Sequence, residues 1–457
     1  MAISIPWNEY EQAILLQTLI DVLEDKIERK QVISEVSGKL RKLAVDQGLI
    51  IDEKFRNKNG IRLQMSCLEY AYTDGKSGMQ VKGGWYFDIV QKYRDNRDLF
   101  EKLLLEPFLF DNYANPSQPY SLSRSAKNAL KEARATIAAC IGALPEEIYF
   151  TSGGTESDNW AIKGFLCQGD NRIIITSKIE HHAVLNACAE IERYGFPVSY
   201  IPVNDQGVVI SKELSRRLSG ARVKLVSIIL VNNEIGTIEP IADLARLAHD
   251  NGALFHTDAV QAAGHIPVDV DKLGVDMLSA SAHKFNGPKG IGFLYVRNGT
   301  NIHQFHNGGA QEHGMRAGTE NVASIVAMAV ALQKNCAQME ENEAKLRKME
   351  TLFISALQTA QIDFIRNGAE QHVPGNINIS IRGASGEMIL HRMDLKGICI
   401  STGSACDSVN TQISHVIREI AVPKEYAKGT IRISFGRDND EDDAVKVAEA
   451  LISIFKK

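Results

Sequence analysis

The hydrophobic pattern of the chain changes near residue 105. Residues 8–46 repeat apolar positions every three or four residues, as in YEQAILLQTLIDVLEDKIERK, which is the period of an amphipathic helix. A polar stretch interrupts this pattern at Asn59-Gly60, where we predict a turn, and a further helical pattern covers residues 89–106. The first 105 residues therefore predict a mostly helical module.

From about residue 120, short apolar segments rich in β-branched residues alternate with helical segments. Gly, Pro, Asn or Asp residues bound these predicted strands, which are EIYFTS, NRIIITS, PVSYIPV, VKLVSIILV, ALFHTDA, VDMLSAS and GIGFLYV. Repeated strand–helix units predict an α/β fold with a large, mainly parallel sheet covered on both faces and sites at the carboxyl ends of its strands.

A smaller α+β lobe is predicted after a long helical stretch near residues 320–360. Its expected elements are strands at NINISI, ICIST and RISFGR, followed by a helix from about Glu441. The predicted domains are thus a helical module over 1–105, a large α/β domain over 106–330 and a small domain over 331–457.

The composition narrows the class of protein. A chain of 457 residues with 44% apolar residues, 23% charged residues and a net charge of -5 is typical of a soluble protein with two or three domains, and argues against a general nucleic-acid coat. No apolar run reaches the roughly 18 residues of a membrane span, and the start does not resemble a signal peptide, so we expect a cytoplasmic protein. The seven cysteines are scattered without a CxxC pair, which predicts neither a disulfide framework nor a metal site.

Lys284 is the first candidate for chemistry. It follows the predicted strand VDMLSAS and precedes a turn rich in Gly and Pro. A lysine in a tight, dry turn at a strand end can have a lowered pKa and form an imine with a carbonyl cofactor. A solvated surface lysine is the alternative.

The segment HTDAVQAAG supplies a second candidate. Asp258 ends the predicted strand ALFHTD, where a carboxylate could hold a pyridinium nitrogen protonated or cap the following helix. Gln261, three residues later, could face the same pocket. After another strand, in EHHAV, His181 could stack on a planar ring and handle protons, although a lone histidine is often structural.

A phosphate cradle is suggested by TSGGTESDN. This segment ends a strand with small residues and opens a helix, whose backbone N–H groups, together with the Thr155 hydroxyl, could bind a phosphate. An ordinary helix start is the alternative.

Two further candidates lie near the carboxyl end of the chain. Cys406 lies in STGSACDS, a loop of small residues suited to a nucleophilic thiolate that must move. In RISFGR, Arg432 could hold a substrate carboxylate with its planar fork or form a surface ion pair. Together with Lys284, Asp258 and His181, these residues combine an imine-forming lysine with a mobile thiol.

These motifs together resemble the NifS/IscS-like cysteine desulfurases, in the class V aminotransferase group of fold-type I pyridoxal-phosphate (PLP) enzymes. The resemblance covers about residues 112–455. It rests on the ordered motifs TSGGTESDNWAIKG, EHHAVLNAC, VNNEIGTIEP, HTDAVQAAG, SAHKFNGPKGIGFLYVR, HGMRAGTEN, STGSACDS and IRISFGR.

The resemblance implies that Lys284 bonds to pyridoxal 5'-phosphate and moves protons, that Asp258 pairs with the ring nitrogen, and that His181 stacks on the ring. It further implies contacts of Gln261 and Asn233 with the cofactor or substrate. For the phosphate it implies a fixed set of ligands, which are Gly154, Thr155, Ser281, His283 and, from the neighbouring subunit of a homodimer, Thr319.

The resemblance also implies a sulfur chemistry. Arg432 and Asn233 would hold the carboxylate of L-cysteine. Cys406 would take the substrate sulfur as a persulfide, leaving L-alanine, and pass it to a sulfur-acceptor protein.

Three departures from the family qualify this expectation. We find no opening segment of the D-N-x-A-T-T type, His313 stands where relatives often have arginine, and the chain ends soon after its last helix. A specialised pathway, such as sulfur modification of tRNA or DNA, is therefore expected over general cluster assembly, with residues 1–105 docking a partner or nucleic acid. Another class V enzyme (an aminotransferase or a selenocysteine lyase) and a non-catalytic PLP-binding scaffold remain the alternatives.

Overall fold

The computed structural model describes residues 7–24, 28–46, 52, 54–81, 84–95, 100, 114–165, 171–402 and 413–455. The chain divides into two compact units. The first comprises Met1–Lys131 and Thr319–Ala323, and the second comprises Glu132–Gly318 and Ser324–Lys457. The domain boundaries expected from the sequence stay predictions.

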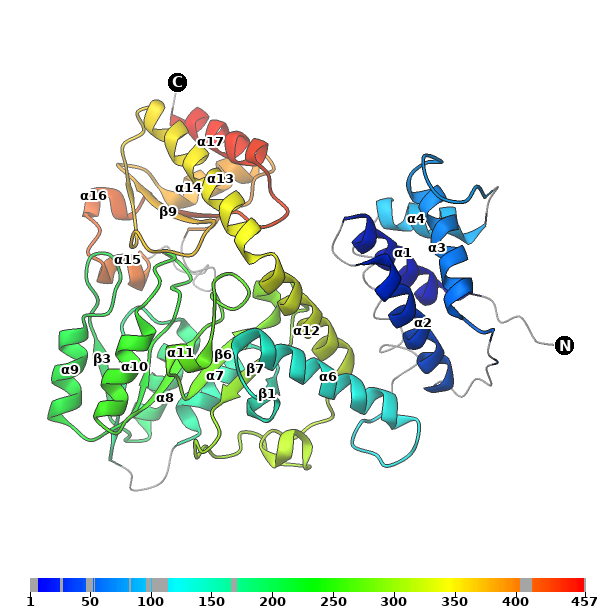
Figure 1. Ribbon diagram of the computed structural model, residues 1–457. Helices are drawn as coiled ribbons and strands as arrows, with labels where there is room; N and C mark the ends of the chain where they lie inside the picture. The colour runs from blue at the N-terminus through cyan, green and yellow to red at the C-terminus, as the bar shows by residue number, and fades with distance from the viewer. Residues whose placement is uncertain are drawn as a thin grey trace. The chain divides into compact units, whose positions relative to one another are not determined.

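The first unit contains a bundle of four helices (Figure 1), α1 (Glu9–Leu23), α2 (Arg29–Asp46), α3 (Lys58–Tyr72) and α4 (Trp85–Asp95). Their apolar faces share one core that includes Leu15, Leu19, Leu68 and Ile89. Each of these helices is amphipathic, so the bundle is the arrangement that removes the apolar stripes from water. The predicted helical character of this region is confirmed.

The turn predicted at Asn59-Gly60 is wrong, because both residues lie inside α3. Asn57 caps this helix: its side-chain oxygen accepts a hydrogen bond from the Gly60 N–H at 2.8 Å. An asparagine next to a glycine is typical of a turn, but here a neighbouring asparagine satisfies the exposed donors of a helix start.

A buried ion pair between Arg56 and Glu11 connects the segment before α3 to the first turn of α1. The Arg56 guanidinium donates to both carboxylate oxygens of Glu11, at 2.9 and 2.7 Å, and the two side chains are only 7% and 6% exposed. Arg56 also lies 3.9 Å from the ring centre of Trp7, and Trp7 stacks on Trp85. The pair therefore links α1, the segment before α3 and α4.

Replacing Arg56 with methionine is expected to destabilise the bundle by about 3–5 kcal/mol, because the Glu11 charge stays buried without its partner. Hydrogen exchange of α1 peptides in the full chain measures this change. The matched control is Lys92→Met, which breaks the exposed pair with Glu9 and should cost about 0–1 kcal/mol. Equal effects of the two substitutions would contradict the prediction.

The second unit is built on a seven-stranded sheet of order β1-β7-β6-β5-β4-β2-β3. Its strands are β1 (Ile148–Thr151), β2 (Ile173–Ser177), β3 (Val198–Ile201), β4 (Val223–Ser227), β5 (Leu254–Asp258), β6 (Met277–Ser281) and β7 (Gly292–Val296). The pairs β2–β3, β2–β4, β4–β5 and β5–β6 are parallel, and only those with β7 are antiparallel. The mainly parallel sheet is as predicted.

Helices connect these strands, as the alternating pattern requires. They are α6 (Ser123–Ile141, which begins in the first unit), α7 (Gly154–Lys163), α8 (His182–Arg193), α9 (Ser211–Gly220), α10 (Ile241–Asp250) and α11 (Val270–Leu273). Apolar residues of α7 and α8, such as Trp160 and Ile191, are fully buried against the sheet residues Leu225, Met277 and Leu294.

The small lobe holds a three-stranded antiparallel sheet of order β10-β9-β8. Its elements, with the helices that lead to it, are α12 (Val322–Ala337), α13 (Met339–Thr359), β8 (Phe364–Arg366), β9 (Asn376–Ile381), α14 (Gly386–Asp394), α15 (His415–Glu419), α16 (Lys424–Ala427), β10 (Thr430–Ser434) and α17 (Glu441–Phe455). The α+β lobe is confirmed. The strand predicted at ICIST is wrong, since only Ser401 forms a single bridge, to Arg432.

In the part of the chain that the structure describes, no helix combines the length and the apolar character needed to cross a bilayer.

Candidate active site

Polar residues gather where neighbouring strands of the large sheet end. Asp258 is the last residue of β5 and Ser281 is the last residue of β6, and the two strands are parallel neighbours. The glycines that follow β1 open α7. Because the carboxyl ends of parallel strands meet at one edge of a sheet, these segments converge there.

Lys284 lies in a short 3₁₀ turn, Ala282–Phe285, directly after β6. Two side chains fix this turn through its carbonyl groups: the His265 ring nitrogen bonds the Lys284 oxygen at 2.7 Å, and the Asn335 amide donates to the Phe285 oxygen at 2.7 Å. Phe285 itself is fully buried. The expected dry environment is wrong for the single chain, because the Lys284 side chain is exposed.

A cavity of about 370 Å³ brings together four of the residues that the sequence singled out. Lys284, Gln261, Asn233 and Arg432 all line it. Arg432 donates to the Asn233 carbonyl at 2.6 Å, while its buried Nε has no hydrogen-bond partner. Burial lowers the pKa of this guanidinium, but arginine stays charged in proteins. The cavity is therefore lined by the Arg432 cation, whose Nε–H remains available to donate a hydrogen bond.

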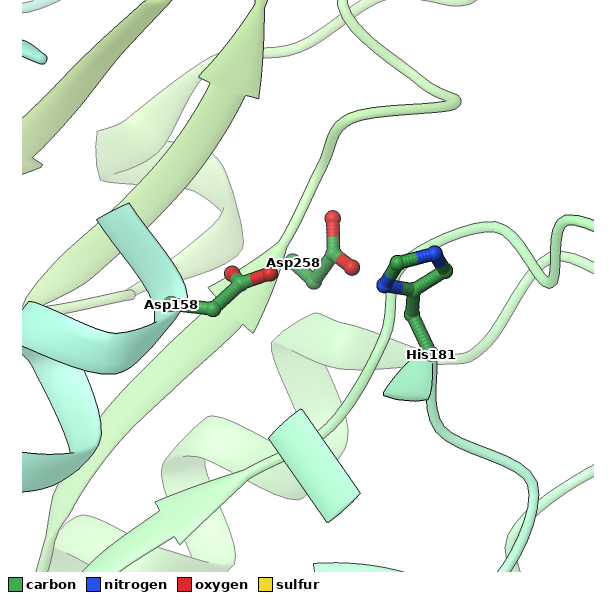
Figure 2. Close-up of side chains that lie close together, drawn as sticks. All are labelled: Asp158, His181 and Asp258. Carbon is green, nitrogen blue, oxygen red and sulfur yellow. The ribbon is translucent and has the colours of Figure 1, made fainter. Parts of the chain in front are cut away.

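Asp258, His181 and Asp158 form a second group (Figure 2). One polar atom of each side chain lies within 4.8 Å of the others. Burial raises the pKa of Asp258 to about 6, although a backbone N–H from Val260 and the charge of Lys284 oppose this shift. Burial lowers the pKa of His181 to about 4. At neutral pH the group thus holds a neutral imidazole beside a carboxylate.

His181 also begins α8, where its Nδ1 accepts a hydrogen bond from the Ala183 N–H at 3.1 Å. An accepting Nδ1 puts the ring proton of the neutral form on Nε2. The local helix cap therefore sets the tautomer and the orientation of the ring.

The start of α7 is packed too closely for a larger residue. A Cβ added to Gly154 would lie 2.5 Å from a methyl group of Val260 and 3.6 Å from the Ser281 Cβ. The Ser281 hydroxyl bonds the His283 ring at 3.0 Å, and the His283 and Thr155 side chains are exposed. Small residues, hydroxyl groups and a helix N-terminus here match the needs of an anion.

Two of the predicted site residues are not described together with this group. Thr319 belongs to the first unit, and Cys406 lies outside the described residues. His313, which stands where relatives often have arginine, makes an edge-to-face ring contact with Tyr149. The roles assigned to Thr319 and Cys406 stay predictions.

The comparison with protein families decides the class of enzyme. A model described as class-V aminotransferase matches residues 104–447. The chain belongs to this family. Among curated relatives, the cysteine desulfurase IscS of Dictyoglomus turgidum is 44% identical over 375 residues, which covers 81% of this chain and 94% of the relative. The class V membership and the likeness to NifS/IscS proteins are thereby confirmed.

Solved structures agree with this assignment. A NifS-like protein superposes with a TM-score of 0.71 at 34% identity and covers 79% of this chain and 96% of its own. SspA in complex with cysteine gives a TM-score of 0.65 at 35% identity, with 73% of this chain and 93% of SspA covered. The predicted fold, the PLP cofactor and the cysteine desulfurase group are confirmed by these relatives.

The family-like region also begins earlier than the motifs predicted. Since 81% of 457 residues is about 370 residues, the similarity to IscS must begin no later than about residue 88. It therefore includes residues that the sequence assigned to the helical module.

The residues present fit the cofactor of this family. The buried Asp258 carboxyl suits a ring nitrogen, the glycine-rich start of α7 suits a phosphate, and the unsatisfied Nε of Arg432 suits a carboxylate. The polar atoms of Asp158, His181 and Asp258 also lie close enough together to hold a metal ion, but a PLP cofactor brings a ring nitrogen with which a buried carboxylate can pair.

Asp158 is the functional candidate that sequence reasoning missed. It stands four residues after Gly154 in α7, and positions four apart share one face of a helix. Because Gly154 was expected to bind the phosphate, the acid that follows it on the same helix face in TSGGTESDN was the signal that could have identified Asp158.

Proposed function

We propose that this chain is a PLP-dependent cysteine desulfurase. Its proposed functional residues are Lys284, Asp258, His181, Arg432 and Cys406. The observation that carries the proposal is the cavity lined together by Lys284, Gln261, Asn233 and Arg432. The Lys284 amine and the Arg432 guanidinium face one space, which supports an amino acid as the substrate. A solved relative of the family is in complex with cysteine.

When bound, the cofactor supplies an electron sink that accepts the charge left on the substrate carbon. Lys284 would hold the cofactor and move the proton to and from the substrate carbon. Asp258 would keep the ring nitrogen protonated, and His181 would stack on the ring with its proton on Nε2. Gln261 and Asn233 would bind polar atoms of the cofactor or substrate, and Gly154, Thr155, Ser281 and His283 would bind the phosphate.

Sulfur moves in a balanced exchange. The Cys406 thiolate attacks the substrate sulfur, so that an S–S bond forms as the C–S bond breaks. The electron pair of the broken bond goes to the carbon side, where a proton completes the methyl group of alanine. The result is L-alanine and a persulfide on Cys406, which passes its terminal sulfur to an acceptor protein.

The remaining expectations extend this proposal. A homodimer would bring Thr319 of a second copy to the phosphate. Residues 1–105 would dock the acceptor or a nucleic acid, in a specialised pathway such as tRNA or DNA sulfur modification. The five described cysteines are free thiols, which suits a reducing compartment such as the cytoplasm.

The test is a paired assay on purified protein. The visible absorption of the lysine-bound cofactor is recorded first, and sulfide and alanine are then measured together after cysteine and a reductant are added. Equal amounts of both products are expected. Pyruvate formed from alanine at the expense of a keto acid acceptor would favour an aminotransferase instead, and cofactor absorption without any product would favour a scaffold.

Arg432 provides a prediction on substrate binding. Arg432→Lys is expected to raise the KM for cysteine about 10- to 100-fold with a smaller change in kcat, because lysine cannot reproduce a planar two-point contact with a carboxylate. Steady-state kinetics measure both constants. Arg382→Lys in the exposed pair with Asp363 is the control and should leave KM unchanged. An unchanged KM in Arg432→Lys would remove this residue from the substrate site.

A further inference from the structure

A row of buried polar side chains lies beneath Asp258. The Ser227 hydroxyl at the end of β4 bonds His256 Nδ1 at 2.8 Å, and His256 Nε2 bonds the Ser279 hydroxyl of β6 at 3.0 Å. All three residues are fully buried. The row crosses three adjacent strands just inside the point where Asp258 ends β5.

Asp158 joins this row from the helix above the sheet. Its side chain, 1% exposed, is hydrogen-bonded to Ser279. Its Oδ1 lies 3.8 Å from His256 Nε2 and has no hydrogen-bond partner. In Figure 2 the Asp158 carboxyl points toward Asp258, and one oxygen of each lies within 4.8 Å of the other. Asp158 is thus a buried carboxyl with one oxygen still to be satisfied.

The surroundings of Asp158 favour its neutral form. Burial raises the pKa of Asp158 well above its usual value, and the nearby carboxyls of Asp258 and Glu180 add to this shift, while the Ser279 bond opposes it. His256 offers no compensating charge, since burial lowers its pKa to about 3. The charge of Lys284 acts on Asp258, where it lowers the pKa of that carboxyl. Two carboxylates this close would not both ionise.

We propose that Asp158 is a positioning residue that stays protonated and presents its proton to the Asp258 carboxylate. The inference rests on the proposed pairing of Asp258 with the ring nitrogen of the cofactor. The donors then run in one direction: Ser227 to His256, His256 to Ser279, Ser279 to Asp158, and Asp158 to Asp258. Every group between Ser227 and Asp258 in this order both donates and accepts, so the one group left as a charged acceptor is Asp258.

This order has a consequence for the cofactor. A neutral donor behind Asp258 fixes the carboxylate in place and leaves its charge for the protonated ring nitrogen. A charged Asp158 would instead push the proton onto Asp258, which could then no longer hold the ring nitrogen in its protonated form.

The test compares two substitutions on the holoenzyme. Asp158→Asn keeps the shape and an N–H donor and cannot ionise, whereas Asp158→Leu removes the donor. Glu239→Gln is the control, because Glu239 is also a buried acid, 2% exposed, that accepts a backbone N–H from Val209. Cofactor content, kcat and KM for cysteine, and the pH titration of the visible band of the lysine-bound cofactor are measured for each.

Asp158→Asn and Glu239→Gln are expected to match the wild type in the band titration and in kcat. Asp158→Leu is expected to lower kcat about 10- to 100-fold with little change in KM. Its visible band should titrate at higher pH, because a ring nitrogen that loses its positive charge no longer repels the proton on the nitrogen that joins Lys284 to the cofactor.

Either of two results would overturn the proposal. A loss in Asp158→Asn as large as that in Asp158→Leu would mean that the charge of Asp158 is needed, and an unchanged titration in Asp158→Leu would mean that Asp258 needs no donor. The titration uses no substrate, so a protein that binds the cofactor but forms no sulfide would disprove the desulfurase reaction while still testing Asp158.

Discussion

Replacing Lys284 with alanine is expected to abolish the visible band of the lysine-bound cofactor and to lower kcat/KM for cysteine by at least about 10⁴-fold. The side chain is the proposed covalent anchor of the cofactor and the proposed carrier of the substrate proton, so one substitution removes both functions. The turn should survive, because His265 and Asn335 hold it through the backbone oxygens of Lys284 and Phe285. Absorption spectra and sulfide release measure the two effects.

Lys289 gives the matched control for this substitution. It is an exposed lysine five residues along the same glycine- and proline-rich turn, so Lys289→Ala removes an equal charge without removing the anchor. Wild-type absorption and activity are expected for Lys289→Ala. If Lys284→Ala kept the band and the activity, another group would have to bind the cofactor.

Replacing Cys406 with alanine is expected to lower sulfide and alanine formation together by at least about 10³-fold and to leave the visible band of the lysine-bound cofactor intact. The thiolate is the proposed nucleophile that takes the substrate sulfur. The proposed mechanism contains no other group that forms the S–S bond. Mass spectrometry of the wild-type protein after one turnover should find the additional sulfur atom on the peptide that contains Cys406.

Cys399→Ala controls for the loss of a thiol. Cys399 is a free, exposed cysteine seven residues before Cys406 in the chain, and its removal is expected to leave both products unchanged. Alanine formation from cysteine that continues at the wild-type rate in Cys406→Ala would show that sulfur leaves without a persulfide at this position.

Local hydrophobic patterns in the sequence predicted most of the strands and helices of the fold. The apolar, β-branched segments that end at Ser177, Asp258 and Ser281 are strands as predicted, because a strand buried in a parallel sheet needs a continuous apolar run. The local patterns failed where one signal allows two structures. Asn59-Gly60 is typical of a turn, yet Asn57 caps a helix there. The apolar run ICIST does not form a strand, because only Ser401 pairs with another segment, in a single bridge to Arg432.

The chain by itself determined which chemical groups were available: an amine at Lys284, a carboxylate at Asp258 and a thiol at Cys406 each follow from a motif in the sequence. Their grouping was decided by the tertiary structure, because residues far apart in sequence meet only where parallel strands end together. Arg432 reaches the Asn233 carbonyl across 199 positions, and Asp158 lies near Asp258 across 100 positions of the chain. Asp158 became a candidate for a neutral donor only through its burial beside another acid, since no local pattern fixes how deeply a carboxyl is removed from water.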